Sequence, residues 1–263
     1  MKIKDVIVAL DGFAPLPLQE DFDNAGLQVG LTEAEVSGAL LCLDATEAIV
    51  DEAIEKGCNL IVTHHPLIFH KLSQVGDADY VQRTVMKAIK NGITIFSMHT
   101  NLDSAEGGVN YMIARKLGME MSSVRLLGEH ELNGVKGGLG IVGDFKEALS
   151  AENFIKKVKE TFGVKCAMTN ELLERPIKKL AICGGAGSFM LPQAIEAKAD
   201  AFLTGEMHYH EYFGHEQQIQ IVVIGHYESE QFTSNLLAEI INERCPEVRT
   251  CVTTLNTNPI IVC

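Results

Sequence analysis

The chain has 263 residues and carries 22 Lys and Arg against 35 Asp and Glu, a formal net charge of −13. A hydrophobic share of 46% with 22% charged residues excludes a disordered chain and fits either one large α/β unit or two modest domains. The acidic balance disfavours nucleic acid as a partner, because a dedicated nucleic-acid binder needs a basic face that displaces phosphate counterions.

The seven cysteines are odd in number, scattered, and free of any C-x-x-C pair. Most lie within apolar runs, where a thiol behaves as a small buried hydrophobic group. The N-terminal residues do not have the pattern of a signal peptide, and no apolar run reaches the length of about 18 residues that a membrane-spanning helix needs. These features predict a reduced, cytoplasmic protein with no membrane association.

Apolar runs alternate with helical patterns along the chain. In the first part, strands are expected at 36–43, 59–63 and 93–98, with helices at 46–56 and 79–91 between them. In the later part, strands are expected at 179–183, 201–204 and 219–224, with a helix at 190–198; further strands at 136–145 and 166–170 flank a helix at 150–161. Such a series predicts an α/β fold whose parallel strands are buried on both faces.

Two pairs of segments align without gaps: 53–65 with 194–206, and 93–103 with 220–230. The second alignment sets His99 opposite His226 and Asp103 opposite Glu230. Either a βαβαβ duplication or the chance similarity of short α/β segments explains this. We predict two α/β domains, with the first discontinuous. The expected ranges are 1–122 with 221–263 for domain I, and 123–220 for domain II.

Histidines and carboxylates gather where the predicted strands end. These segments are Thr63-His64-His65-Pro66, Ser97 to Asp103, and Gly225 to Glu230. In an open α/β sheet, ligands bind beyond the carboxyl ends of the strands. Pro66 favours a turn after which both imidazoles face one cleft. A lone histidine is more often structural, but three such strand ends favour a metal site, and mixed imidazole and carboxylate ligands suit Zn, Fe or Mn.

Five motifs now carry a family resemblance. They are Phe22-Asp23-Asn24-Ala25-Gly26-Leu27-Gln28-Val29-Gly30, His64-His65-Pro66-Leu67-Ile68-Phe69, His99-Thr100-Asn101-Leu102-Asp103, Gly205-Glu206-Met207 and Gly225-His226-Tyr227-Glu228-Ser229-Glu230. Because these motifs occur in the same order and with comparable spacing, the chain resembles the GTP cyclohydrolase I type 2 homologues, which are dinuclear-metal hexameric proteins. The resemblance implies two α/β domains, a toroidal homohexamer and two divalent metal ions per subunit, held at the strand carboxyl ends between the domains.

Carried onto this sequence, the resemblance gives His65 and Asp103 to one metal and His64 and His226 to the other, with Glu230 bridging the two. Two departures stand out. Phe22 replaces a Trp of many relatives, and His208-Tyr209-His210 replaces two consecutive histidines. We therefore leave His208 and His210 out of the expected metal shell.

Several candidates keep two interpretations. The loop Gly184-Gly185-Ala186-Gly187-Ser188 could cradle a phosphate, but a tight strand-to-helix turn explains its glycines better. His99, His208 and His210 could transfer protons or serve as supporting or exposed residues. Asp44 could cap a helix or face the cleft, and Asp23 and Asn24 could shape the cleft or form a turn.

The resulting hypothesis is a metal-dependent hydrolase in which Glu230 and His99 are catalytic. By resemblance, its reaction is hydrolysis of a cyclic amidine C–N bond, opening the imidazole ring of GTP or a related small nucleotide-like heterocycle. The alternative is a non-enzymatic metal-binding ring with a regulatory or interaction role.

Overall fold

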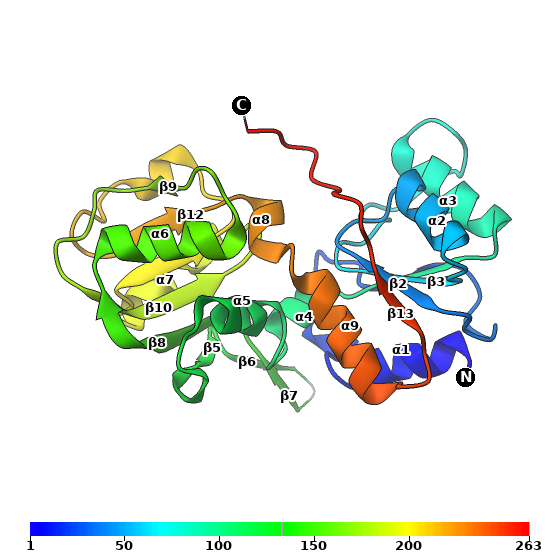
Figure 1. Cartoon of the computed structure of the whole chain (residues 1–263), viewed down its shortest axis with the longest axis horizontal. Coiled ribbons are helices and arrows are strands. Elements are labelled where there is room, and N and C mark those ends of the chain that lie inside the picture. The colour runs from blue at the N-terminus through cyan, green and yellow to red at the C-terminus, as the bar shows by residue number, and fades with distance from the viewer. Residues whose placement is uncertain (133, 263) are drawn as a thin grey trace. The chain divides into compact units, whose positions relative to one another are not determined.

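The computed structural model describes residues 1–132 and 134–262, and it divides into two compact units (Figure 1). The first unit comprises Met1–Ala105 and Thr233–Pro259, and the second comprises Glu106–Phe232 together with the residues from Ile260 on. The chain therefore leaves the first unit and returns to it. The prediction of a mixed α/β fold with two units is confirmed.

The first unit is built on a five-stranded sheet with the order β1-β4-β3-β2-β13. Its strands are β1 (Gly26–Val29), β2 (Ala39–Cys42), β3 (Leu60–Thr63), β4 (Thr94–Ser97) and β13 (Thr250–Val252). Its helices are α1 (Ile3–Asp11), α2 (Glu47–Glu55), α3 (Tyr80–Lys90), α4 (Thr100–Ser104) and α9 (Thr233–Arg244), with a short 3₁₀ turn at Leu16–Leu18. The strands β13, β2, β3 and β4 run parallel, and β1 is the antiparallel edge strand.

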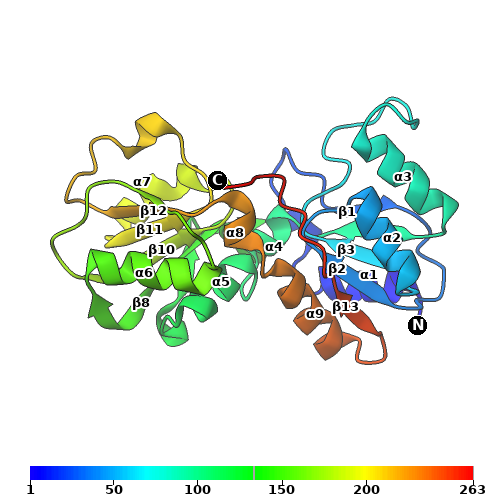
Figure 2. The ribbon, with the colours of Figure 1, turned by 45° about the horizontal axis from the view of Figure 1, so that its top comes forward.

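Helices cover both faces of this sheet, with α2 and α3 on one side and α1 and α9 on the other (Figures 1 and 2). Every residue of β2, β3 and β4 is buried, which is why these strands read as continuous apolar runs. The helices α2 and α3 begin where predicted, because Thr46 and Asp79 cap them by accepting hydrogen bonds from the backbone N–H groups of Ile49 and Gln82.

The second unit is built on a six-stranded sheet with the order β5-β8-β10-β11-β12-β9. Its strands are β5 (Arg125–Leu127), β8 (Gly140–Leu149), β9 (Met168–Thr169), β10 (Ile177–Cys183), β11 (Ala201–Thr204) and β12 (Gln220–Val223), and a separate hairpin pairs β6 (His130–Leu132) with β7 (Val135–Gly137). Its helices are α5 (Val109–Leu117), α6 (Ala151–Phe162), α7 (Leu191–Glu196) and α8 (His226–Glu230), with 3₁₀ turns at Met121–Ser123, Ser188–Met190 and Tyr209–Tyr212.

The two sheets share a pattern. In each, three neighbouring strands run parallel (β2-β3-β4 and β10-β11-β12), and an antiparallel strand pairs with the last of them (β1 and β9). The segments that align in the sequence supply matching strands, since 53–65 contains β3 and 194–206 contains β11. This correspondence favours duplication over chance similarity.

The boundaries expected from the sequence, 122/123 and 220/221, both lie inside the second unit. The helix α5 belongs to that unit because it packs against α6 and β10, and β12 belongs there because it pairs with β11.

No helix in the described part of the chain has the length and apolar character to span a membrane.

Candidate metal centre

The chain turns directly after β3, and this turn brings two adjacent histidines together. Thr63 ends the strand, and its hydroxyl donates to the carbonyl oxygen of His65 at 2.8 Å and lies 2.7 Å from the hydroxyl of Ser97 at the end of β4. The ring centroids of His64 and His65 lie 4.9 Å apart. In a continuing strand their side chains would point to opposite faces. The structure thus shows the turn expected at Pro66.

A third histidine joins this pair from the end of the neighbouring strand. The ring of His99, which precedes α4, lies 5.2 Å from that of His64 and 5.5 Å from that of His65. One ring nitrogen from each of the three lies within 4.8 Å of the others, close enough to share a metal ion. Asp103, one turn along α4, places its Oδ1 3.6 Å from Nε2 of His64. We call these four residues the first-unit cluster.

Two histidines of the cluster are held in place through Nδ1. Nδ1 of His64 lies 2.8 Å from the carbonyl oxygen of Met98, and Nδ1 of His65 lies 2.7 Å from Oδ1 of Asp44. The hydroxyl of Thr257 donates to the other Asp44 oxygen at 2.6 Å. Burial alone would raise the pKa of Asp44, but the hydrogen bonds from His65 and Thr257 and the charge of the imidazole outweigh it and lower this pKa.

His99 is held in the same way by Asp23. Nδ1 of His99 lies 2.7 Å from Oδ1 of Asp23, and the other carboxylate oxygen accepts hydrogen bonds from the backbone N–H and the hydroxyl of Thr100. Burial again raises the pKa of Asp23, but the hydrogen bond and charge of His99 and the bonds from Thr100 outweigh it and bring this pKa to about 2. Asp23 is therefore an ionised partner of His99 and not only a turn residue.

The second unit presents a smaller group on α8. His226 and Glu230 are one helical turn apart, with Nε2 of His226 3.2 Å from Oε2 of Glu230. Nδ1 of His226 lies 2.9 Å from Oε1 of Glu206, which follows β11. We call His226 and Glu230 the second-unit pair.

A glycine makes room for the second-unit pair. A Cβ on Gly185 would lie 2.3 Å from Oε1 of Glu230 and 3.4 Å from Cε1 of His226. Gly185 also has φ +58°, a conformation that residues with a side chain rarely adopt. Both the space and the backbone therefore require glycine at this position.

The four anchored histidines share one chemical consequence. The partner of each Nδ1 is a carbonyl or a carboxylate oxygen, which has no hydrogen to donate, so Nδ1 must be the donor. A neutral imidazole then keeps its lone pair on Nε2, the form in which histidine binds a metal. The residues present therefore fit divalent metal ions of the Zn, Fe or Mn type.

Other predicted residues take different roles. The backbone N–H groups of Gly184, Gly185 and Gly187 donate to the side chains of Asn110, Ser229 and Thr204, so the glycine loop is a tight turn whose donors are occupied. Thr46, and not Asp44, caps α2.

His208 and His210 are exposed; His208 precedes the 3₁₀ turn at Tyr209–Tyr212 as its N-terminal cap, and His210 lies within it. Asn24 bonds the carbonyl oxygen of Ile68 through its side-chain amide.

Two of the supporting contacts have no clear signal in the sequence. Glu206 lies in a motif that the resemblance includes, but nothing in its spacing points to Nδ1 of His226. Thr257 lies far from Asp44 in the chain and reaches it only because β13 returns the C-terminal segment to the first unit.

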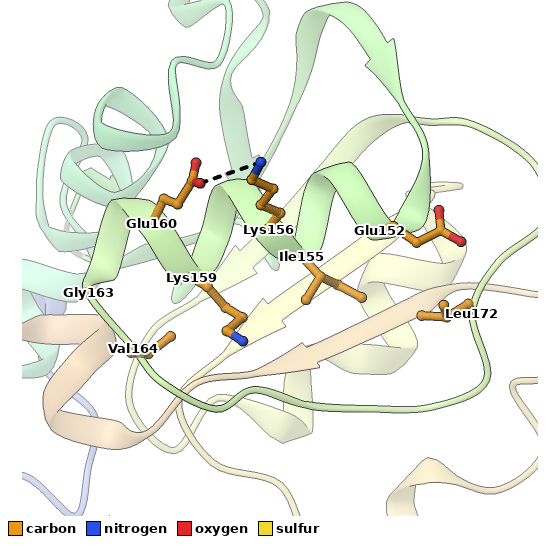
Figure 3. Close-up of a pocket in the computed structure, with 8 residues that line it drawn as sticks. All are labelled: Glu152, Ile155, Lys156, Lys159, Glu160, Gly163, Val164 and Leu172. Atoms are coloured by element: carbon orange, nitrogen blue, oxygen red, sulfur yellow. Dashed lines mark ion pairs between the residues drawn. The ribbon is translucent and has the colours of Figure 1, made fainter.

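A hollow of about 300 Å³ lies beside the first-unit cluster. It is lined by Asp44, Ala45, Thr46, His65, Pro66, Leu67, Tyr80, Thr257 and Pro259. A larger open hollow of about 700 Å³ lies against α6, where Lys156 and Glu160 form an exposed ion pair (Figure 3). No candidate metal ligand lines the larger hollow. The smaller one, which contains a polar wall and His65, is the better place for a substrate.

Two α/β units, each with anchored histidine and carboxylate side chains at the carboxyl ends of its strands, define a class of candidate metal proteins. The sequence matches the Duf34/NIF3 (NGG1p interacting factor 3) family over residues 1–259. The chain belongs to this family.

Curated relatives agree over most of the chain. A GTP cyclohydrolase 1 type 2 homolog of Clostridium acetobutylicum is 34% identical over 232 residues, 88% of this chain and 85% of the relative. One of Campylobacter jejuni is 30% identical over 260 residues, 98% of both chains. A NIF3-like protein 1 of Drosophila melanogaster is 32% identical over 254 residues, 93% of this chain and 84% of the relative. The predicted resemblance is confirmed.

Solved structures show the same fold. The Staphylococcus aureus hypothetical protein SA1388 matches with a TM-score of 0.90 and 28% identity, covering 100% of this chain and 99% of that one. Reduced HcgD from Methanocaldococcus jannaschii matches with a TM-score of 0.78 and 26% identity, covering 97% and 98%.

Proposed function

We propose that this protein is a dinuclear-metal-dependent hydrolase that opens a ring in GTP or a related nucleotide or heterocycle. In this proposal His65 and Asp103 would hold one divalent ion, His64 and His226 would hold the other, and Glu230 would be a ligand shared by both. The ions are Zn, Fe or Mn. The observation that carries the proposal is that the three proposed histidine ligands, His64, His65 and His226, each have Nδ1 held by an oxygen acceptor, the arrangement typical of histidines that bind a metal through Nε2.

The proposed chemistry divides between the ions and the side chains. Two bound divalent ions would lower the pKa of a water molecule and polarise the bond to be hydrolysed. His99 is the proposed proton carrier, because Asp23 orients its ring through Nδ1 and one of its ring nitrogens lies within 4.8 Å of ring nitrogens of His64 and His65. Glu230 is the second proposed catalytic residue, since its carboxylate lies beside His226.

The choice of substrate class rests on the relatives. Several are named GTP cyclohydrolase 1 type 2 homologs. In the corresponding reaction, water hydrolyses one C–N bond of a cyclic amidine and opens the ring to a formamide, and hydrolysis of the second C–N bond of the same carbon then releases formate. The hollow beside His65 supports a small ligand, because the polar residues Thr46, Tyr80 and Thr257 line it together with His65. By the same resemblance we propose a toroidal homohexamer in the cytoplasm.

Turnover is the direct test. The full-length protein is purified aerobically and anaerobically, loaded with Zn²⁺, Fe²⁺ or Mn²⁺, and assayed for formate release from GTP and for hydrolysis of other nucleotides, phosphoesters and cyclic amides. We expect turnover of a ring-containing substrate that Glu230→Gln abolishes. Glu243→Gln, an exposed change on α9, is the matched control and should retain activity.

The alternative is a metal-binding ring with an interaction role, favoured by the family's description as an interacting factor and by the NIF3-like relative. It predicts no turnover of any substrate in the panel, with Glu230→Gln altering metal content alone. That result would replace the hydrolase proposal. Sedimentation or light scattering of the same preparations tests the hexamer.

A further inference from the structure

Two cysteines far apart in the sequence lie together in the first unit. Cys58 occupies the turn between α2 and β3, and Cys251 lies in the middle of β13. Cys58 belongs to a buried apolar cluster of this unit, and Cys251 packs against the same cluster. Neither belongs to the first-unit cluster of metal ligands.

The sheet explains how these side chains meet. Cys251 on β13 lies opposite Leu40 on β2, and Gly38 precedes Leu40 by two residues, so Gly38 faces the same side of the sheet. A Cβ on Gly38 would lie 3.1 Å from Sγ of Cys58 and 2.7 Å from Nη2 of Arg249. The missing side chain at Gly38 therefore leaves the space through which Cys58 approaches β13.

Arg249 holds both sides of this contact. Its Nη1 donates to Sγ of Cys251 at 3.2 Å, and its Nη2 donates to the carbonyl oxygens of Lys56 and Gly57 at 2.8 and 3.2 Å. The second pair of bonds fixes the turn that carries Cys58. One guanidinium group thus contacts Cys251 and the turn that carries Cys58.

The two thiols differ in their surroundings. Cys251 is partly exposed, whereas Cys58 is buried with 3% of its surface accessible. Burial is the main cause that raises the pKa of Cys58, followed by the neighbouring Cys251, and these outweigh the opposing effect of Arg249. A small oxidant therefore reaches Cys251 first, while Cys58 stays a protected thiol next to it.

We propose that Cys251 and Cys58 form a reversible redox pair in which hydrogen peroxide oxidises Cys251 and Cys58 then closes a disulfide. In the first step the Cys251 thiolate attacks one peroxide oxygen. An S–O bond forms, the O–O bond breaks, and hydroxide leaves and takes up a proton to become water. In the second step the Cys58 sulfur attacks the Cys251 sulfur, the S–O bond breaks, and a second water leaves with the Cys58 proton. Two thiols are thus oxidised to one disulfide while one peroxide is reduced to two waters.

The disulfide would join β13 to the turn before β3. The segment after β13 contacts α2 through hydrogen bonds from Thr253 and Thr254 to Glu52, and it reaches Asp44 through Thr257. Oxidation would therefore fix the start of the segment that supports Asp44, the partner of His65.

The test is peptide mapping of the full-length folded protein after treatment with hydrogen peroxide. After blocking of free thiols, digestion without reductant is expected to give a peptide that links Cys58 to Cys251, and dithiothreitol should restore both thiols. Arg249→Gln is expected to slow formation of the link by about tenfold, because the turn that carries Cys58 is no longer held beside Cys251.

Cysteine variants assign the two roles. Cys58→Ala should leave a sulfenic acid on Cys251 that dimedone traps, and Cys251→Ala should leave Cys58 as a thiol. Cys166→Ala, which changes an exposed cysteine of the second unit, is the matched control and should still form the link. Circular dichroism checks that each variant is folded. The proposal is overturned if Cys58 and Cys251 remain thiols in the wild-type protein, or if peroxide modifies Cys166 while no link forms.

Discussion

The first and second units use the same arrangement of three parallel strands and an antiparallel edge strand, but they place different side chains at the strand ends. After β3 the first unit has two histidines, whereas after β11 the second has Gly205 and Glu206. The following strands lead to similar helices, with His99 and Asp103 on one side and His226 and Glu230 on the other. One scaffold thus offers a group of three imidazoles and one carboxylate in the first unit, and a pair of one imidazole and one carboxylate in the second.

The two units also differ in the groups that accept a hydrogen bond from Nδ1 of each histidine. The first unit anchors its imidazoles with a backbone carbonyl and with Asp44 and Asp23, whereas the second anchors His226 with Glu206 from the strand end itself. The residue that aligns with the metal-ligand candidate His65 thus supports a histidine in the second unit. If the site is dinuclear, the first unit should contribute most of the binding energy, and the following experiments test this comparison.

The largest effect is expected from removing a proposed ligand of the first unit. His64→Ala should reduce metal affinity by more than about 100-fold, because even residues that only support a ligand contribute 10- to 100-fold. Elemental analysis after dialysis measures the bound metal. His210→Ala, which removes an exposed histidine, should keep full metal content. Equal metal content in both variants would contradict the proposed site.

The supporting carboxylates should show the next largest effect. Asp44→Asn in the first unit and Glu206→Gln in the second each remove the ionised partner of one Nδ1, and we expect metal affinity to fall about 10- to 100-fold in each. Competition with a chelator gives both values, and Glu243→Gln is the surface control. If Glu206→Gln binds metal with the affinity of the wild-type protein, Glu206 does not support His226 as a metal ligand, and the proposed role of the second unit is contradicted.

Two glycines of the second unit distinguish the steric cost of an added side chain from the cost of its backbone conformation. Gly185→Ala places a Cβ against Glu230, whereas Gly163→Ala has nothing within 4 Å of the added atom, although both glycines have positive φ. The strained backbone conformation should lower the free energy of unfolding by about 1 kcal/mol in both variants. We expect the free energy of unfolding of Gly185→Ala to fall by about 2 kcal/mol in total. Urea unfolding measures the difference. Equal destabilisation would show that Glu230 has room to move away.

The smallest expected effect is the loss of stability at acidic pH that arises from Asp23. Its pKa is lowered from 3.8 to about 2, so its contribution to stability is present above the unfolded value and is lost as the pH falls through the folded value. When the pH falls from about 6 to about 3, the free energy of unfolding of the metal-free wild-type protein should fall by about 1 kcal/mol more than that of the Asp23→Asn variant. Urea unfolding at both pH values checks this. A parallel loss in the two proteins would contradict the ion pair with His99.

Local patterns in the sequence were enough to place many of the elements. The capping residues Thr46, Asp79 and Ser150 mark the starts of three predicted helices, and each accepts the expected backbone hydrogen bond. Histidines and carboxylates that follow apolar runs also indicated a metal site at the strand ends, and the family resemblance then supplied the ligand set. These features depend on neighbours in the chain.

The supporting contacts depend on distant parts of the chain. Asp23 precedes β1, and it reaches His99 only because β1 pairs with β4 across the sheet. Thr257 reaches Asp44 only because β13 joins the same sheet as β2. Short segments such as β1 and β13 carry little pattern of their own, so no local rule assigns their partners.

In the proposed function one dinuclear metal centre takes ligands from both units, and crystallography with anomalous scattering is the direct test of this proposal. Crystals of the metal-loaded protein should give two anomalous peaks per chain, one beside His65 and Asp103 and the other beside His64 and His226, with the Glu230 carboxylate between them. The absence of peaks at these residues, or a single peak with Glu230 out of reach, would contradict the account.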